Sequence, residues 1–250
     1  ARIIQLLQRF VEDEEQKRGW QLTKTPLMAK SDLYKLSGHW EHYKDGMFVL
    51  GDEEKDNEVF ALRTMTCPFQ YQAYLNRPRS YKDLPLRYNE TSTLFRNESS
   101  GEMHGLIRVR QFTISEGHLM CTPYQLEKEF KACVELAMYM LKTLGLYEDV
   151  SYRFSMWNSE DNQKYIGTKE QWDEAQNIMR KILNHLDISY NEGIGEAAFY
   201  GPKLDIQIKN VHDKEDTIIT IQIDLMLAEK FGMEYVDADG KKKNPYIIHR

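Results

Sequence analysis

The spacing of hydrophobic positions along the chain predicts amphipathic helices in several places. Apolar residues recur every three to four positions at the start of the chain, opposite a polar face that ends at Gly19. Thr168 directly precedes another such run and suits a helix N-cap. The helices expected on this ground span residues 2–18, 124–144 and 169–186, with shorter ones around Leu33 and after Pro68.

Apolar runs bounded by turn residues predict β-strands. The expected strands span residues 47–50, 58–65, 84–98, 106–121, 151–156, 203–209, 217–225 and 246–249. The polar loop between 84–98 and 106–121 is too long for a tight turn and predicts a hairpin with a mobile loop. Asp239 and Gly240 predict a second hairpin, between residues 233–236 and the last strand.

Hairpins dominate over strand–helix–strand alternation in this pattern. We therefore predict an α+β fold, with a mostly antiparallel sheet flanked by helices. Neither a GxGxxG segment nor a phosphate-binding P-loop occurs in the sequence, which argues against a doubly wound dinucleotide-binding fold.

Composition and charge narrow the class of protein. The 250 residues carry a net charge of −6, which argues against non-specific nucleic-acid binding by the chain as a whole. No apolar run is long enough to cross a bilayer, and the first residues lack a signal-peptide cleavage pattern. The three cysteines are an odd number, so a disulfide framework is not expected. These features together predict a cytoplasmic protein that does not engage a membrane.

Cys67, His118 and His249 are candidate metal ligands. Cysteine and histidine are good zinc ligands, and three protein ligands with an open fourth position are typical of catalytic zinc. The three residues lie far apart in the sequence, however, so their spacing gives no local signature, and taken alone it favours a buried thiol and two unrelated histidines.

Two further groups of residues suit substrate binding. Arg96, Arg108 and Arg110 lie on strands expected to be neighbours, where alternate residues share a face, and their guanidinium groups suit phosphate oxygens. The alternative is a set of surface arginines paired with nearby acids. Tyr200 and Lys203, in the segment GEAAFYGPKLDI, are either substrate contacts or parts of a well-packed corner.

Segments along nearly the whole chain resemble those of threonyl-tRNA synthetases, in the same order and at similar spacings. They are GHWEHYKDGMF, MTCP, SYKDLPLRYNE, LFRNESSGEMHGLIRVRQFT, EGH, AFYGPKLDIQI, IQIDL and YIIHR. The segment FRNE is similar to the second signature motif of class II synthetases. The first helix and Pro26 are similar to the first motif, which forms the dimer interface in that family.

The resemblance implies an enzyme that activates L-threonine with ATP and transfers it to tRNA(Thr). Cys67, His118 and His249 match the ligands of one Zn²⁺ per chain, which in the family binds the threonine amino and hydroxyl groups. A site built to bind a hydroxyl rejects an analogue that lacks it. Magnesium is expected with ATP, and a homodimer is expected through the first-motif region.

The resemblance also implies roles for individual residues. Arg96 matches the catalytic arginine that holds the ATP α-phosphate and the threonine carboxylate. The expected ATP-binding residues are Arg96, Glu98, Arg108, Phe112 and Lys203, with Glu98 reading adenine, Phe112 stacking on it and Arg108 at the γ-phosphate. The expected threonine-binding residues are Arg96, Glu116, Tyr200 and Gln222.

The sequence departs from the family pattern in three places. The family commonly has Asn-Cys-Pro with a histidine soon after, whereas this chain reads Thr-Cys-Pro-Phe-Gln over residues 66–70, so the support around the metal ligand is expected to differ. Ile114 and Glu116 stand where the family has glutamine and aspartate.

The third departure is at the end of the sequence. From the resemblance, residues 1–250 are expected to form a single class II catalytic domain that stops before the third signature motif, without editing or anticodon-binding domains. The isolated chain is accordingly expected to have weak activity or none. The alternative function is a synthetase-like, zinc-dependent amino acid sensor or regulatory protein without ligase activity.

Overall fold

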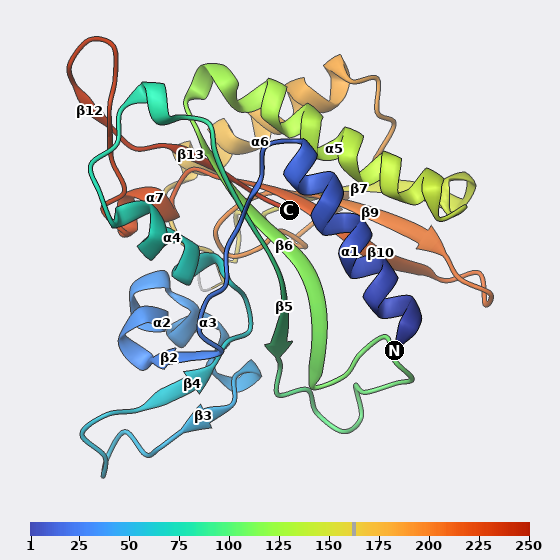
Figure 1. Cartoon of the computed structure of the whole chain (residues 1–250), viewed down its shortest axis with the longest axis horizontal. Coiled ribbons are helices and arrows are strands. Elements are labelled where there is room, and N and C mark those ends of the chain that lie inside the picture. Colours follow the sequence, from blue (N-terminus) through green and yellow to red (C-terminus); the bar gives the residue numbers. More distant parts are fainter. Residues whose placement is uncertain (162–163) are drawn as a thin grey trace. The chain divides into compact units, whose positions relative to one another are not determined.

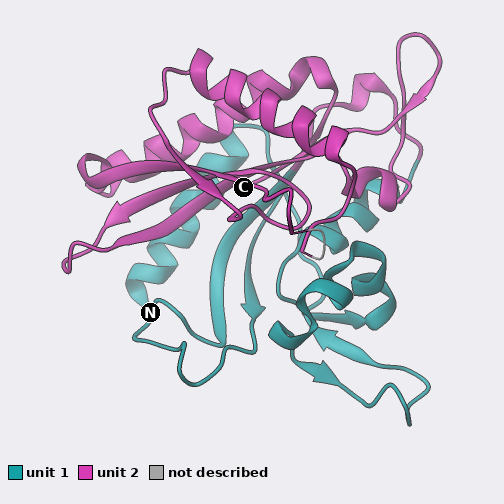
Figure 2. Ribbon diagram, turned by 180° about the vertical axis from the view of Figure 1, so that it is seen from behind, with its two compact units in different colours: residues 1–77, 87–118 teal, residues 78–86, 119–250 magenta. Residues whose placement is uncertain are grey.

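The computed structural model describes residues 1–161 and 164–250, which form two compact units (Figures 1 and 2). Unit 1 comprises residues 1–77 and 87–118, and unit 2 comprises residues 78–86 and 119–250. No helix within these described residues has both the length and the hydropathy needed to cross a membrane.

Unit 1 begins with helix α1 (Arg2–Lys17), close to the predicted span. The helix is fixed near its C-terminal end by Glu15, which is fully buried. The carboxylate of Glu15 accepts hydrogen bonds from the Ser115 hydroxyl, at 2.6 Å, and from the Asn89 amide. Strand β1 (Gln21–Leu22) follows and pairs in parallel with β5 (Leu86–Phe95).

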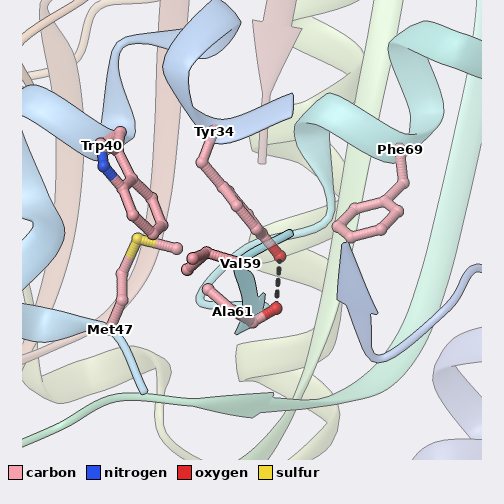
Figure 3. Close-up of a cluster of buried hydrophobic side chains, with 6 residues drawn as sticks. All are labelled: Tyr34, Trp40, Met47, Val59, Ala61 and Phe69. Carbon is pink, nitrogen blue, oxygen red and sulfur yellow. Dashed lines mark hydrogen bonds between the residues drawn. The ribbon is translucent and has the colours of Figure 1, made fainter. Parts of the chain in front are cut away.

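A small three-stranded sheet with short helices makes up the rest of the N-terminal part of unit 1. Its elements are β2 (Met28–Lys30), α2 (Ser31–Ser37), α3 (His39–Tyr43), η1 (Lys44–Gly46), β3 (Val49–Leu50), β4 (Phe60–Leu62) and α4 (Cys67–Leu75). The strand order is β2-β4-β3. Its core cluster includes Tyr34, Trp40 and Phe69, and the Tyr34 hydroxyl donates to the Ala61 carbonyl at 3.3 Å (Figure 3).

The two long strands of the predicted hairpin are shorter than expected. Strand β5 ends at Phe95 and β6 (Gln111–Cys121) begins only at Gln111, so Arg96, Glu98 and Arg108 lie in the connecting segment. The physical reason is that this segment is polar and solvent-exposed, with Gly105 in the left-handed region at φ +51°. Its conformation is held by side-chain contacts instead of a continuous strand ladder.

Unit 2 is built on five strands in the order β13-β10-β9-β7-β8. They span Tyr246–His249, Glu215–Asp224, Lys203–Lys209, Val150–Met156 and Asn191–Ile194, respectively. All neighbouring pairs in this series are antiparallel except β7 with β8. Helices α5 (Leu126–Thr143) and α6 (Lys169–His185) pack on the strands (Figure 1). The predicted α+β class, with a mostly antiparallel sheet and flanking helices, is therefore confirmed.

The predicted C-terminal hairpin is wrong in its partner. Strand β11 (Tyr235–Val236) pairs with β12 (Lys242–Lys243) around the turn at Gly240, and the last strand, β13, pairs with β10. Ile247 and Ile248 of β13 are fully buried, and such residues need a place inside a larger sheet. The remaining short elements are η2 (Tyr81–Asp83), η3 (Pro123–Gln125), η4 (Tyr147–Asp149) and α7 (Leu227–Lys230).

Candidate active site

In unit 1 the structure brings Cys67 and His118 together. Cys67 is the first residue of α4, which begins after Thr66 and has Pro68 in its first turn, a position that does not need a backbone N–H. His118 lies on β6 and its side chain is fully buried. Cys67 Sγ and a ring nitrogen of His118 lie within 4.8 Å of each other. This distance suits two ligands of one metal ion.

The orientation of the His118 ring is set by Gln70, one turn into α4. The Gln70 side chain is fully buried, and its Oε1 lies 2.6 Å from His118 Nδ1. Its Nε2 donates to the Thr23 hydroxyl at 2.8 Å. With Gln70 Oε1 as acceptor, Nδ1 carries the ring proton and Nε2 carries the lone pair that a metal needs. The sequence marks Gln70 only as a departure from the family pattern and does not predict its contact with His118.

Glu116 contacts the segment that precedes Cys67. Its Oε2 accepts hydrogen bonds from the Thr66 backbone N–H at 2.8 Å and from the Thr66 hydroxyl at 2.7 Å. Its Oε1 lies 3.7 Å from His118 Nε2. Two residues that depart from the family pattern are thus in direct contact with each other. The predicted role of Glu116 in threonine binding stays a prediction.

Four of the five residues expected at ATP lie in unit 1, namely Arg96, Glu98, Arg108 and Phe112. The Arg96 guanidinium sits over the Phe112 ring, 5.0 Å from its centroid. The Glu98 carboxylate accepts a hydrogen bond from Arg108 Nε at 2.8 Å. This bond raises the pKa of the Arg108 guanidinium above its ordinary value, so the group stays charged. Arg110 donates to the Glu98 backbone carbonyl at 3.0 Å.

The contacts of the arginines differ from one another, and their predicted binding of phosphate stays a prediction. Arg108 is paired with acidic neighbours, Glu98 and Glu102, as a surface arginine would be. Arg96 instead packs over the Phe112 ring in a cation–π contact. Ile114, which stands where the family has glutamine, is half-buried on β6 and offers no polar group.

In unit 2 three predicted residues converge on one another. His249 Nε2 lies 2.9 Å from Asp224 Oδ2, and the buried Asp224 accepts from two backbone N–H groups at the start of α7 through its other oxygen. The Tyr200 ring stacks on the His249 imidazole with centroids 4.8 Å apart. The Tyr200 hydroxyl donates to Gln222 Oε1 at 2.7 Å. Gln222 and His249 are themselves paired across β10 and β13.

Lys203 has a different environment from that expected of a nucleotide contact. Its ammonium group donates to the buried Asp205 carboxylate at 2.6 Å, and Ser155 donates to the same oxygen at 2.7 Å. The Lys203 side chain retains 23% exposure. Its predicted contact with the nucleotide stays a prediction.

Comparison with known proteins gives the family context of these sites. The profile of the tRNA synthetase class II core domain (G, H, P, S and T) matches residues 48–250. The chain is 71% identical over all 250 residues to the threonine--tRNA ligase of Clostridium perfringens, and it spans 39% of the length of that protein. The resemblance to threonyl-tRNA synthetases noted in the sequence is thereby confirmed.

Solved structures show the same fold. A crystal structure described as the RNA-binding domain of threonyl-tRNA synthetase from Cryptosporidium parvum matches 98% of the chain and 59% of its own length, with 33% identity and a TM-score of 0.88. Prolyl-tRNA synthetase of Giardia lamblia, at 17% identity, matches 97% of the chain and 42% of its own length with a TM-score of 0.70. At that identity the second match shows the fold alone.

The backbone beside Tyr200 permits no side chain at Gly201. A Cβ atom built there would lie 2.2 Å from the Ile223 carbonyl oxygen. Around Gly101, in contrast, there is no atom within 4 Å of a built Cβ. Both comparisons concern one added methyl group, so the two glycines form a matched pair.

We expect Gly201→Ala to lower the free energy of unfolding by about 1–3 kcal/mol, because the backbone must shift to relieve the overlap. Gly101→Ala should change it by less than about 0.5 kcal/mol. Urea denaturation of the chain measures both. Equal effects of the two substitutions would contradict the close approach of the Gly201 and Ile223 backbones.

Proposed function

The chain belongs to the tRNA synthetase class II core family, and we propose that its protein is a threonine--tRNA ligase with residues 1–250 in the catalytic domain. The observation that carries this proposal is the 71% identity with a relative of that name over the whole chain. Its partners would be ATP, L-threonine and tRNA(Thr), and the protein would be located in the cytoplasm. Because the chain spans only 39% of the length of that relative, we propose the ligase activity for the full-length protein and not for residues 1–250 alone.

We assign one Zn²⁺ per chain to Cys67, His118 and His249. The support is the donor set, one thiol and two imidazoles that are all buried. His118 Nδ1 is engaged by Gln70 and His249 Nε2 by Asp224, so the other nitrogen of each ring is the one suited to a metal. When bound, the zinc would supply an open position for the threonine amino and hydroxyl groups.

The residues at the nucleotide act by position and charge. In the activation step a threonine carboxylate oxygen attacks the α-phosphorus of ATP, and the bond to pyrophosphate breaks. Arg96 would hold both the carboxylate and the α-phosphate, while Arg108 and Mg²⁺ neutralise the charge on the leaving pyrophosphate. Glu98 and Phe112 would orient adenine. A hydroxyl of tRNA then attacks the carbonyl carbon, which releases AMP.

Lys203 and the remaining pocket residues complete the assignment. Lys203 would contact the nucleotide, with Asp205 holding its ammonium group in place. Glu116, Tyr200 and Gln222 would line the threonine pocket. The hydrogen bond between Tyr200 and Gln222 supports a shared role for that pair.

We also propose that the protein forms a homodimer through the first-motif region. Helix α1 exposes four apolar side chains along its first two turns. They are Ile3, Ile4, Leu6 and Leu7, which are 74%, 62%, 49% and 39% exposed. Burying such a surface against a second copy would be favourable by about 25 cal/mol per Å² of apolar area.

The ligase activity is tested by threonine-dependent exchange of pyrophosphate into ATP, measured on the full-length protein. We expect exchange with threonine, and a loss of at least about 10²-fold in kcat for Arg96→Lys, because lysine lacks the planar fork that holds two anions. Arg180→Lys is the control, since Arg180 lies in unit 2 and pairs with Glu192, and neither residue is assigned to ATP or threonine. Zinc binding without exchange for any amino acid would favour the sensor alternative.

The metal assignment predicts that Cys67→Ser, His118→Ala and His249→Ala each reduce the zinc content of the purified chain to near zero. Loss of one of three protein ligands leaves too few donors for a stable site. Elemental analysis measures the content, and Cys133→Ser, at another buried thiol, should retain zinc. Unchanged zinc content in all three ligand variants would refute the site.

The dimer assignment predicts that the double substitution Ile4→Lys, Leu7→Lys weakens self-association of the full-length protein by at least tenfold, because charges would replace apolar contacts. Sedimentation equilibrium measures the dissociation constant. Ile194→Lys is a matched control, because Ile194 is 70% exposed on β8 in unit 2. An unchanged dissociation constant in the double variant would exclude this face of α1.

A further inference from the structure

The contacts around His118 lead back to a buried carboxylate in the interior of unit 1. We propose that Gln70 is a positioning residue that holds His118 with its proton on Nδ1. We also propose that the Thr23 hydroxyl, which faces the Glu90 carboxylate and the Asn89 carbonyl, dictates which way the Gln70 amide faces. The inference rests on the proposed metal role of His118 and extends it to residues that do not contact the metal.

The Gln70 amide has two possible orientations with opposite consequences. In the observed one, Oε1 lies 2.6 Å from His118 Nδ1 and Nε2 lies 2.8 Å from Thr23 Oγ1. If the amide were rotated by 180°, its NH₂ group would face Nδ1, which would then have to act as acceptor. The ring proton would move to Nε2 and block the nitrogen that is assigned to the metal. Gln70 is fully buried, so water does not replace either of these hydrogen-bond partners.

The Thr23 hydroxyl selects between the two orientations. It has one proton, and two acceptors lie near it, the Asn89 carbonyl at 3.0 Å and Glu90 Oε2 at 3.2 Å. With the proton donated to either of them, only oxygen lone pairs remain for Gln70. The Gln70 group facing Thr23 must therefore be the NH₂ group, and Oε1 must face His118.

The Asn89 carbonyl and the Glu90 carboxylate both face the Thr23 hydroxyl as acceptors, so the Thr23 proton points toward them. A carboxylate that forms an ion pair only accepts hydrogen bonds, and the Arg63 guanidinium donates from Nη1 to Glu90 Oε1 at 3.0 Å. The Arg63 and Glu90 side chains are 1% and 3% exposed. The Thr25 hydroxyl and backbone N–H also donate to Glu90. The Thr25 hydroxyl thus points its proton toward Glu90, and the Thr23 hydroxyl points its proton toward Glu90 and the Asn89 carbonyl.

The ordered series is therefore Arg63, Glu90, Thr23, Gln70 and His118, and its last member presents Nε2 for a metal. His249 is supported differently, by the carboxylate of Asp224 directly. A carboxylate accepts in any orientation, whereas an amide needs its direction fixed. Because the partner of His118 is the neutral Gln70 amide, the orientation of His118 depends on further residues, whereas the orientation of His249 is set by the Asp224 carboxylate directly.

The test begins with Gln70→Met, which preserves approximate volume and removes both amide functions. Gln207→Met is the matched control, because Gln207 is also buried and its Nε2 donates to the Thr217 hydroxyl at 3.2 Å. Long-range ¹H–¹⁵N NMR spectra of the metal-free chain, at a pH where imidazole is neutral, report the His118 tautomer. We expect protonated Nδ1 in the wild type and the control, and a mixture of tautomers in Gln70→Met.

Zinc affinity, measured by competition with a chromophoric chelator, should fall 10- to 100-fold in Gln70→Met and remain unchanged in Gln207→Met. Gln70→Glu retains an acceptor for Nδ1–H and should keep the wild-type tautomer. Thr23→Val, compared with Thr217→Val, should give a mixture of tautomers although Gln70 is intact. This second variant also serves if Gln70→Met does not fold, as judged by circular dichroism.

A wild-type tautomer in both Gln70→Met and Thr23→Val would overturn the inference, whatever the zinc affinity. If the wild-type chain binds no zinc, the metal assignment fails, and the tautomer of the metal-free variants still decides whether Gln70 positions His118. The two failures are therefore distinguishable.

Discussion

Burial leaves each polar side chain in the interior of unit 1 with few ways to be satisfied, and the buried Arg63–Glu90 ion pair sets the pattern for the others. Removing one partner of such a pair typically costs about 3–5 kcal/mol, because the remaining charge has no compensation. The Thr25 and Thr23 hydroxyl groups face the Glu90 carboxylate as donors, and the Gln70 NH₂ group donates to Thr23. The orientation of His118 is thus tied to the folding of unit 1 as a whole.

Unit 2 reaches a comparable result with fewer residues. Asp224 stands at the end of β10, where one oxygen accepts the first N–H groups before α7 and the other faces His249. The Tyr200 ring stacks on the His249 imidazole and so restricts the plane of that ring. A capping carboxylate and an aromatic ring therefore fix this histidine without a longer network.

The departures from the family pattern are related in space within unit 1. Thr66 and Glu116 hydrogen-bond to each other, so the side chains at these two positions form one contact and are best considered as a pair. Gln70 contacts the imidazole of His118. Substitutions that look independent along the chain therefore concern the same few ångströms around the first residue of α4. Ile114 has no comparable polar contact to explain it.

The sequence by itself determined the α+β class and most helices, because hydrophobic period is a local property. Residues 203–209 and 246–249 were placed correctly as strands for the same reason. The candidate zinc ligands came from residue chemistry together with the family resemblance, and their role stays a prediction. Tertiary structure alone decided that β13 pairs with β10 and that the strands before Arg96 and after Arg110 stop short. It also decided the partner of His118, since Thr23, Gln70 and Glu90 are far apart in the chain and meet only when unit 1 folds. Strand partners and buried hydrogen bonds depend on which surfaces meet, and no local pattern encodes that.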